Sequence, residues 1–168
     1  SRNHGLGERD RLLLQIAVTL HACGKFISMK NSNECGYALI MSTEIIGLSH
    51  LEREIIANVV RYNIRDFDYD MMQLETEAGQ DLAGVSDRTA ITILIAKLTA
   101  ILRLANSMDK THKSKLIDCR MAVREGQLVI TTGYKGDLAL ESASFEQKAA
   151  FFEEIFGIRP VLKQKRRV

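Results

Sequence analysis

The chain has 168 residues, of which 46% are hydrophobic and 26% are charged. This composition predicts a globular protein with one sizeable domain, or a domain with a small appendage, and excludes an intrinsically disordered chain. The net charge of +2 is too small to indicate nucleic-acid binding by itself.

Cys23, Cys35 and Cys119 are an odd number without CxxC spacing, so neither a disulfide framework nor a structural zinc site is indicated. No segment resembles a signal peptide, and the longest apolar stretch, near Ile91 to Ile95, is interrupted by polar residues. We therefore expect a cytoplasmic protein without a membrane segment. Because the sequence starts without Met, we also expect it to be a piece of a larger protein.

The first predicted elements are helices. Apolar residues at three- and four-residue spacing predict a helix from Glu8 to Cys23, with Gly24 ending it. A shorter helix is expected from Cys35 to Met41, after a polar run. His21 would then lie at the last turn of the first helix.

A third helix has a clear start. Ser49 and Glu52 form a capping box, followed by an apolar stripe that should end near Tyr62. From Ile64 to Val85 the pattern weakens, and we expect a loop with one short helix.

The strongest helical period runs from Asp87 to Met108, over about six turns. This helix should be central to the core. Asp109 follows its end, where a carboxylate is disfavoured by the helix dipole and needs a cationic or hydrogen-bonding partner.

After Thr111 the period becomes alternating, which predicts a small sheet. Two strands, Leu116 to Arg124 and Gln127 to Thr132, should be joined by a turn at residues 125–126. A third strand is expected at Leu138 to Leu140. A capping box of Ser144 and Gln147 predicts a helix to Phe156, stopped by Gly157, before a last strand from Ile158 to Leu162. The fold class is therefore α+β: a mainly helical domain (residues 1–113) followed by a small β-β-β-α-β unit (residues 114–168).

Histidine and aspartate at helix ends raise the question of metal hydrolysis. His21 is followed by Ala22, where a hydrolase metal motif of the HD type has Asp, so His21 and Asp109 are remnant positions. Two ligands are too few for phosphoryl chemistry on a divalent metal. We expect His21 to be a core histidine bonded to Asp109, no metal or other cofactor, and no catalytic residue in this domain.

Basic residues flank the ends of the predicted helices. If these ends converge, they form a rim suited to phosphate groups, although cations are favourable at helix C-termini in any case. The candidate polyanion-binding residues are Lys25, Lys30, Arg61, Arg65 and Arg103. The basic end of the chain is expected to be a solvated tail; it contains Lys163, Lys165, Arg166 and Arg167.

Several segments together carry a family resemblance: residues 20–27, 37–40, 47–62, 100–112 and 140–157. In their order and spacing they resemble the C-terminal HD-like domain of the exopolyphosphatase and guanosine pentaphosphate phosphohydrolase (Ppx/GppA) family, over essentially the whole chain. Ala22, Asn63 and the turn at residues 32–35 depart from the metal-ligand positions of that pattern.

The resemblance implies an accessory domain that helps to bind polyphosphate, or a similar phosphate polyanion, and contributes to homodimer contacts. It also implies an N-terminal actin-like phosphatase domain in the same bacterial protein, where catalysis takes place, with Mg as a cofactor of the parent enzyme. We expect no nucleic-acid partner. Two alternatives remain: a divergent metal-dependent phosphohydrolase that uses His21, Asp109, Glu34 and Cys35 or Asn63, and a purely structural dimerisation module.

Overall fold

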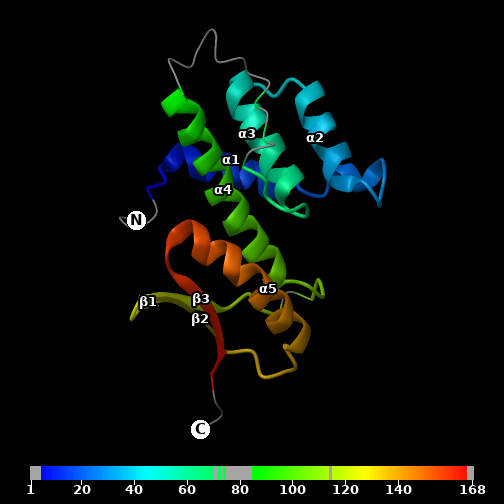
Figure 1. Cartoon of the computed structure of the whole chain (residues 1–168). Helices are drawn as coiled ribbons and strands as arrows, with labels where there is room; N and C mark the ends of the chain where they lie inside the picture. The colour runs from blue at the N-terminus through cyan, green and yellow to red at the C-terminus, as the bar shows by residue number, and fades with distance from the viewer. Residues whose placement is uncertain (1–4, 70–71, 73, 75–84, 114, 166–168) are drawn as a thin grey trace. The chain divides into compact units, whose positions relative to one another are not determined.

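The computed structural model describes residues 5–69, 72, 74, 85–113 and 115–165 (Figure 1). It is a mainly helical α+β fold, as predicted. The chain divides into two compact units, Ser1–Leu102 and Arg103–Val168. The domain boundary expected after residue 113 stays a prediction.

The first unit is helical. Its elements are α1 (Glu8–Leu20), the 3₁₀ helix η1 (Cys23–Phe26), α2 (Ser32–Ser42), α3 (His50–Tyr62) and the first part of α4 (Val85–Met108). The long helix α4 and the end of α3 match the sequence prediction. The short helix expected between residues 64 and 85 falls largely outside the described residues.

The prediction that Gly24 ends the first helix is wrong: α1 ends at Leu20, and Gly24 lies four residues further on, inside η1. A Cβ atom at Gly24 would lie 1.8 Å from the Ser32 carbonyl oxygen and 2.5 Å from the Gly36 amide nitrogen. The backbone of η1 therefore touches the first turn of α2, and any side chain at residue 24 would separate them.

The predicted capping box at the start of α3 is confirmed. Ser49 N donates to Glu52 Oε2 over 2.9 Å, and Glu52 N donates to Ser49 Oγ over 3.2 Å. Arg9 on α1 pairs with the same carboxylate, its second guanidinium nitrogen lying 2.8 Å from Glu52 Oε2. This hydrogen bond is the main reason that the pKa of Glu52 is lowered to about 2, and the pair ties α1 to α3.

The core of the first unit is built around α3 and α4. Apolar side chains from five segments of the unit pack together there: Leu13, Ala17, Ile40, Ile55, Ile56, Ala57, Val59, Val60, Leu74, Ile91, Ile95, Leu98 and Leu102. The segment Arg88–Met108 is long and apolar enough to cross a membrane by length and composition, and half of its most apolar window is buried inside the protein. Its part in this core accounts for that apolar character.

The second unit holds a three-stranded sheet and one helix. The strands β1 (Cys119–Arg124) and β2 (Gln127–Thr132) are antiparallel, and β3 (Arg159–Gln164) pairs with β2 in parallel. The helix α5 (Ala139–Phe156) makes the crossover from β2 to β3. Its end at Gly157 is confirmed, with a left-handed φ of 67°.

The third strand predicted at Leu138 to Leu140 is wrong, and so is the capping box of Ser144 and Gln147. The helix α5 already begins at Ala139, where Asp137 Oδ1 accepts a hydrogen bond from Ala139 N over 2.8 Å. This side chain satisfies a free amide at the helix start, so the helix begins earlier than the apolar pattern indicated. The second unit is therefore β-β-α-β.

Replacing Gly24 with Ala tests the contact between η1 and α2. We expect Gly24→Ala to lower the free energy of unfolding by more than about 2 kcal/mol, because backbone atoms must move to admit the methyl group. Urea denaturation measures the difference. Gly133→Ala is the control, since no atom lies within 4 Å of a Cβ at that position; an equal effect of the two substitutions would contradict the close contact.

Candidate functional site

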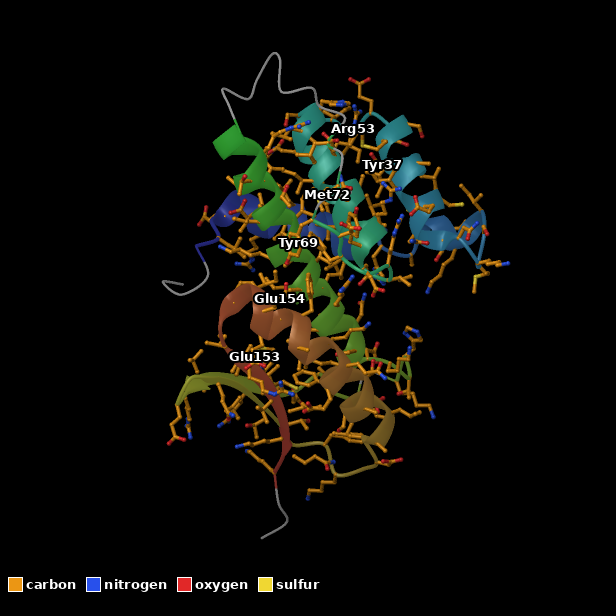
Figure 2. All side chains as sticks on the ribbon, in the orientation of Figure 1. Tyr37, Arg53, Tyr69, Met72, Glu153 and Glu154 are labelled. Carbon is orange, nitrogen blue, oxygen red and sulfur yellow. The ribbon has the colours of Figure 1, made fainter. Side chains whose placement is uncertain are left out.

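Two arginines of α3 and its following turn share one carboxylate of α2. Arg61 Nε donates to Glu34 Oε1 over 3.0 Å, and its terminal NH2 group lies 2.8 Å from Glu34 Oε2. Arg65 donates to Glu34 Oε1 over 3.2 Å. The guanidinium of Arg61 also stacks over the ring of Tyr37, 4.7 Å from its centroid; Tyr37 projects from α2 (Figure 2).

The electrostatics of this cluster favour the charged forms. Partial burial works to raise the pKa of Glu34, but the hydrogen bonds and charges of Arg61 and Arg65 outweigh it and lower the pKa. Partial burial likewise opposes the charged form of Arg61, yet Glu34 raises the pKa of that guanidinium. The carboxylate therefore stays ionised and holds both arginines at one end of the α2–α3 pair.

Two of the candidate lysines lie in the segment that leads into the same end of α2. Lys25 is exposed on η1, next to the glycine that touches the first turn of α2, and Lys30 is exposed just before that helix. Glu34 occupies the first turn of α2, and it pairs with the last turn of α3. The four predicted residues of the first unit, Lys25, Lys30, Arg61 and Arg65, therefore come from segments that meet at one end of this helix pair.

Arg103, the fifth candidate, belongs to the second unit. Its side chain is buried, with 8% exposure, and its guanidinium lies 4.6 Å from the ring centroid of Phe151. A buried guanidinium stacked on an aromatic ring is a structural contact, so the structure does not add Arg103 to the helix-end group.

The remnant metal positions have other partners. His21 Nδ1 donates to the Val18 carbonyl over 2.6 Å, and Asp109 Oδ2 lies 4.0 Å from His112 Nδ1. Since His21 and Asp109 fall in different units, their pairing stays a prediction.

The alternative ligand set for a metal hydrolase includes a carboxylate that is already paired. Its carboxylate, Glu34, is held by two arginines. Across the described parts of the chain, no three His, Cys, Asp or Glu side chains lie close enough together to hold a metal ion. These residues do not fit a divalent metal, which needs several carboxylate or imidazole ligands around one point.

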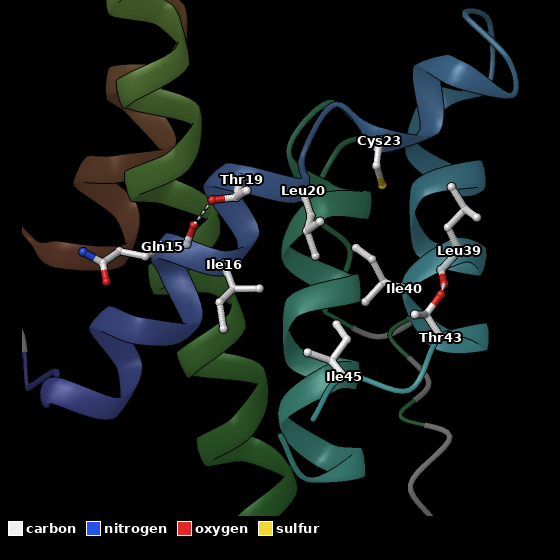
Figure 3. Close-up of a pocket in the computed structure, with 9 residues that line it drawn as sticks. All are labelled: Gln15, Ile16, Thr19, Leu20, Cys23, Leu39, Ile40, Thr43 and Ile45. Carbon is white, nitrogen blue, oxygen red and sulfur yellow. Dashed lines mark hydrogen bonds between the residues drawn. The ribbon is translucent and has the colours of Figure 1, made fainter. Parts of the chain in front are cut away.

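An apolar pocket of about 560 Å³ lies between α1 and α2 (Figure 3). Its lining is mostly aliphatic: Gln15, Ile16, Thr19, Leu20, Cys23, Leu39, Ile40, Thr43 and Ile45. The hydroxyls of Thr19 and Thr43 donate to carbonyls of neighbouring helical turns, and burial raises the pKa of the Cys23 thiol. A thiol with a raised pKa is a poor nucleophile, so the pocket offers no catalytic group.

The second unit has its own buried carboxylate. Glu141 on α5 is fully buried; Thr111 donates to one oxygen and Lys115 Nζ lies 3.2 Å from the other. The bond from Thr111 is the main cause of the lowered pKa of Glu141. The hydrogen bonds of Thr111 and Lys115 to Glu141 fix the segment before β1 to α5, which indicates a structural role for this carboxylate.

The sequence analysis did not identify the two residues of α2 that contact the arginines: Glu34, which pairs with Arg61 and Arg65, and Tyr37, which stacks against Arg61. In the sequence Glu34 stands only as one ligand of the alternative metal set, because nothing near it in the chain indicates an arginine partner. The helix predicted from Cys35 begins at Ser32 instead, which places Glu34 in its first turn, where acidic residues are favourable. The pairing with Arg61, 27 residues away, could be found only once the two helices were placed.

No curated protein matches the chain. The family model for Ppx/GppA phosphatase, domain III, matches residues 2–149, which is most of the sequence and includes all of the candidate residues. A domain III implies an N-terminal domain of the same protein as its partner. The chain belongs to the Ppx/GppA phosphatase family, as an accessory domain of that type of phosphatase.

Proposed function

We propose that this domain binds inorganic polyphosphate, or a similar phosphate polyanion, for a Ppx/GppA phosphatase, and that it carries no catalytic residue itself. The supporting observation is that Arg61 and Arg65 share the Glu34 carboxylate at one end of the α2–α3 pair, and that the segment with two exposed lysines leads into the same end of α2. The residues are Lys25, Lys30, Arg61, Arg65 and the central Glu34. Three positive charges remain in excess, which favours a chain of phosphates.

The arginines suit phosphate by geometry as well as charge. Arg61 already holds a carboxylate with two of its nitrogens, and a phosphate group accepts the same fork of hydrogen bonds. Glu34 is then an internal substitute for the ligand. Asp66, next to Arg65, reduces the local positive charge, so each exposed lysine should matter for affinity.

The reaction itself is assigned to the N-terminal domain of the parent protein. That domain would release terminal phosphate from polyphosphate or guanosine pentaphosphate, with Mg as its cofactor, in the cytoplasm. The present domain would hold the remainder of the chain and contribute to homodimer contacts.

A second candidate is a purely structural dimerisation module. It is favoured by apolar side chains on the segment that carries the lysines: Phe26 is 94% exposed, Met29 is 77% exposed and Ile27 is 61% exposed. Such side chains together on a surface suit a subunit contact. A module of this kind would have no affinity for polyanions, so a polyphosphate titration separates it from the first candidate.

Removing the two exposed lysine charges should weaken polyphosphate binding. At about 50 mM salt we expect Lys25→Gln/Lys30→Gln to raise the Kd for fluorescent polyphosphate several-fold, and to reduce the slope of log Kd against log salt by about 1.5, since about two phosphate contacts are lost. Fluorescence anisotropy at two salt concentrations measures both effects.

The matched control removes two exposed charges elsewhere in the first unit, Arg11→Gln/Arg88→Gln. It should bind as the unchanged chain does. Equal Kd values for the lysine variant and the unchanged chain would contradict this proposal, and so would absence of salt-sensitive binding.

The substitution Glu34→Gln tests whether the Glu34 carboxylate competes with phosphate for the arginines or is needed to position them. If Glu34 only occupies the place of a phosphate, the substitution removes a competing negative charge and should lower the Kd for polyphosphate about threefold or more. The loss in stability should be modest, about 0.5–1 kcal/mol, because the ion pairs are partly exposed. A higher Kd in a folded Glu34→Gln variant, judged by circular dichroism, would show instead that the carboxylate is needed to place the arginines.

A further inference from the structure

The register of the three strands places basic residues in rows on one face of the sheet. Arg120 on β1 is opposite Thr131 on β2, which is opposite Lys163 on β3. Four residues along β1, Arg124 forms the same kind of row with Gln127 and Arg159. Because alternate residues of a strand point to the same side, both rows lie on one face.

The opposite face of the sheet is covered over β2 and β3, whereas Met121 and Val123 of β1 stay exposed on it. Ile130 and Thr132 on β2 are each 1% exposed, and α5 packs against β3 (Figure 1). The basic side chains occupy the alternate strand positions and therefore lie on the other face of the sheet. Arg120, Arg124 and Lys163 are exposed there. Within this unit, α5 covers the apolar face and leaves the basic face open.

Most of the charge on the open face is not neutralised. Among the described residues no ion pair or side-chain hydrogen bond is recorded for Arg120, Arg124 or Lys163, and the nine strand positions of this face include no Asp or Glu. Arg159 differs, since it pairs with two carboxylates of α5, Glu153 over 2.8 Å and Glu146 over 3.0 Å, so its charge is neutralised within the unit. The face therefore has a charge complementary to an anion.

The chain extends this charge beyond β3. Lys165 N donates to the Thr132 carbonyl over 3.0 Å, so the pairing with β2 continues past Gln164, and Lys165 has the same parity as Lys163. Neighbouring strands are about 4.8 Å apart, so a row across the three strands spans about 10 Å. Long basic side chains over that width can contact several groups of an extended anion.

The centre of the open face indicates which anion fits. It consists of the small aliphatic residues Ala122, Val129 and Val161, in one cross-strand row. Single-stranded nucleic acids are bound by aromatic side chains on which the bases stack, and this face has none. A phosphate chain without bases needs only the cations.

We infer that the open face of the sheet is a second polyanion-binding surface, which takes a linear phosphate chain without bases across Arg120, Arg124 and Lys163. It shares the ligand class of the proposed function but none of its residues, so either surface could bind if the other did not. The bound chain would lie on the side of the sheet away from α5.

The test compares three double variants of the full chain by polyphosphate anisotropy at two salt concentrations: Arg120→Gln/Lys163→Gln, Lys25→Gln/Lys30→Gln and the control Arg11→Gln/Arg88→Gln. The sheet variant should raise the Kd several-fold at about 50 mM salt and reduce the slope of log Kd against log salt by about 1.5, since about two phosphate contacts are lost. These exposed side chains have no recorded partners, so the thermal unfolding midpoint should not change. An oligouridylate with the same number of phosphates is the second ligand.

The outcomes separate the two surfaces. A sheet variant that binds polyphosphate as the control does overturns this inference, even if the lysine variant is weakened. A sheet variant that is weakened while the lysine variant is unchanged supports it and leaves the helix-end proposal without support. Tighter binding of oligouridylate than of polyphosphate, lost in the sheet variant, would make the surface a nucleic-acid site and overturn the assignment to a chain without bases.

Discussion

The backbone contact between η1 and the first turn of α2 is the constraint on which the helix-end cluster depends. It exists because residue 24 has no side chain, and a Cβ atom there would overlap the Ser32 carbonyl. The contact brings the segment with Lys25 and Lys30 to the start of α2. It fixes the backbone of η1, which carries Lys25, against the first turn of α2, where Glu34 holds the arginines.

Glu34 completes this arrangement from the other side. Ionised and shared between Arg61 and Arg65, it keeps two guanidinium groups at the start of α2 against their mutual repulsion. The same bonds leave the arginines partly neutralised in the absence of a ligand. In the proposed function, a phosphate group would replace Glu34 as the partner of these arginines. Because the arginines already have an anionic partner, the polyanion should bind weakly enough to be released, and its binding should weaken as the salt concentration increases.

Elements with a strong local signal could be predicted from the sequence, and those decided by tertiary contacts could not. The apolar period of α4 and the reciprocal bonds of Ser49 and Glu52 are local, and both are confirmed. The strand expected at Leu138 to Leu140 is wrong because α5 begins at Ala139, whose amide donates to Asp137 Oδ1, and the alternation of apolar residues does not reveal this. The bond of Glu34 to Arg61 and the rows across the sheet join distant residues, so no spacing along the chain contains them. Family membership was recognisable because it rests on the order of many short segments.

The proposed function requires a phosphate chain to bind at the end of the α2–α3 pair. The most direct measurement is a titration of the ¹⁵N-labelled chain with short polyphosphate, followed by amide chemical shifts. The account predicts salt-reversible shifts in residues 24–34 and 61–65, on both sides of Glu34. Saturating polyphosphate that leaves those amides unmoved would contradict it.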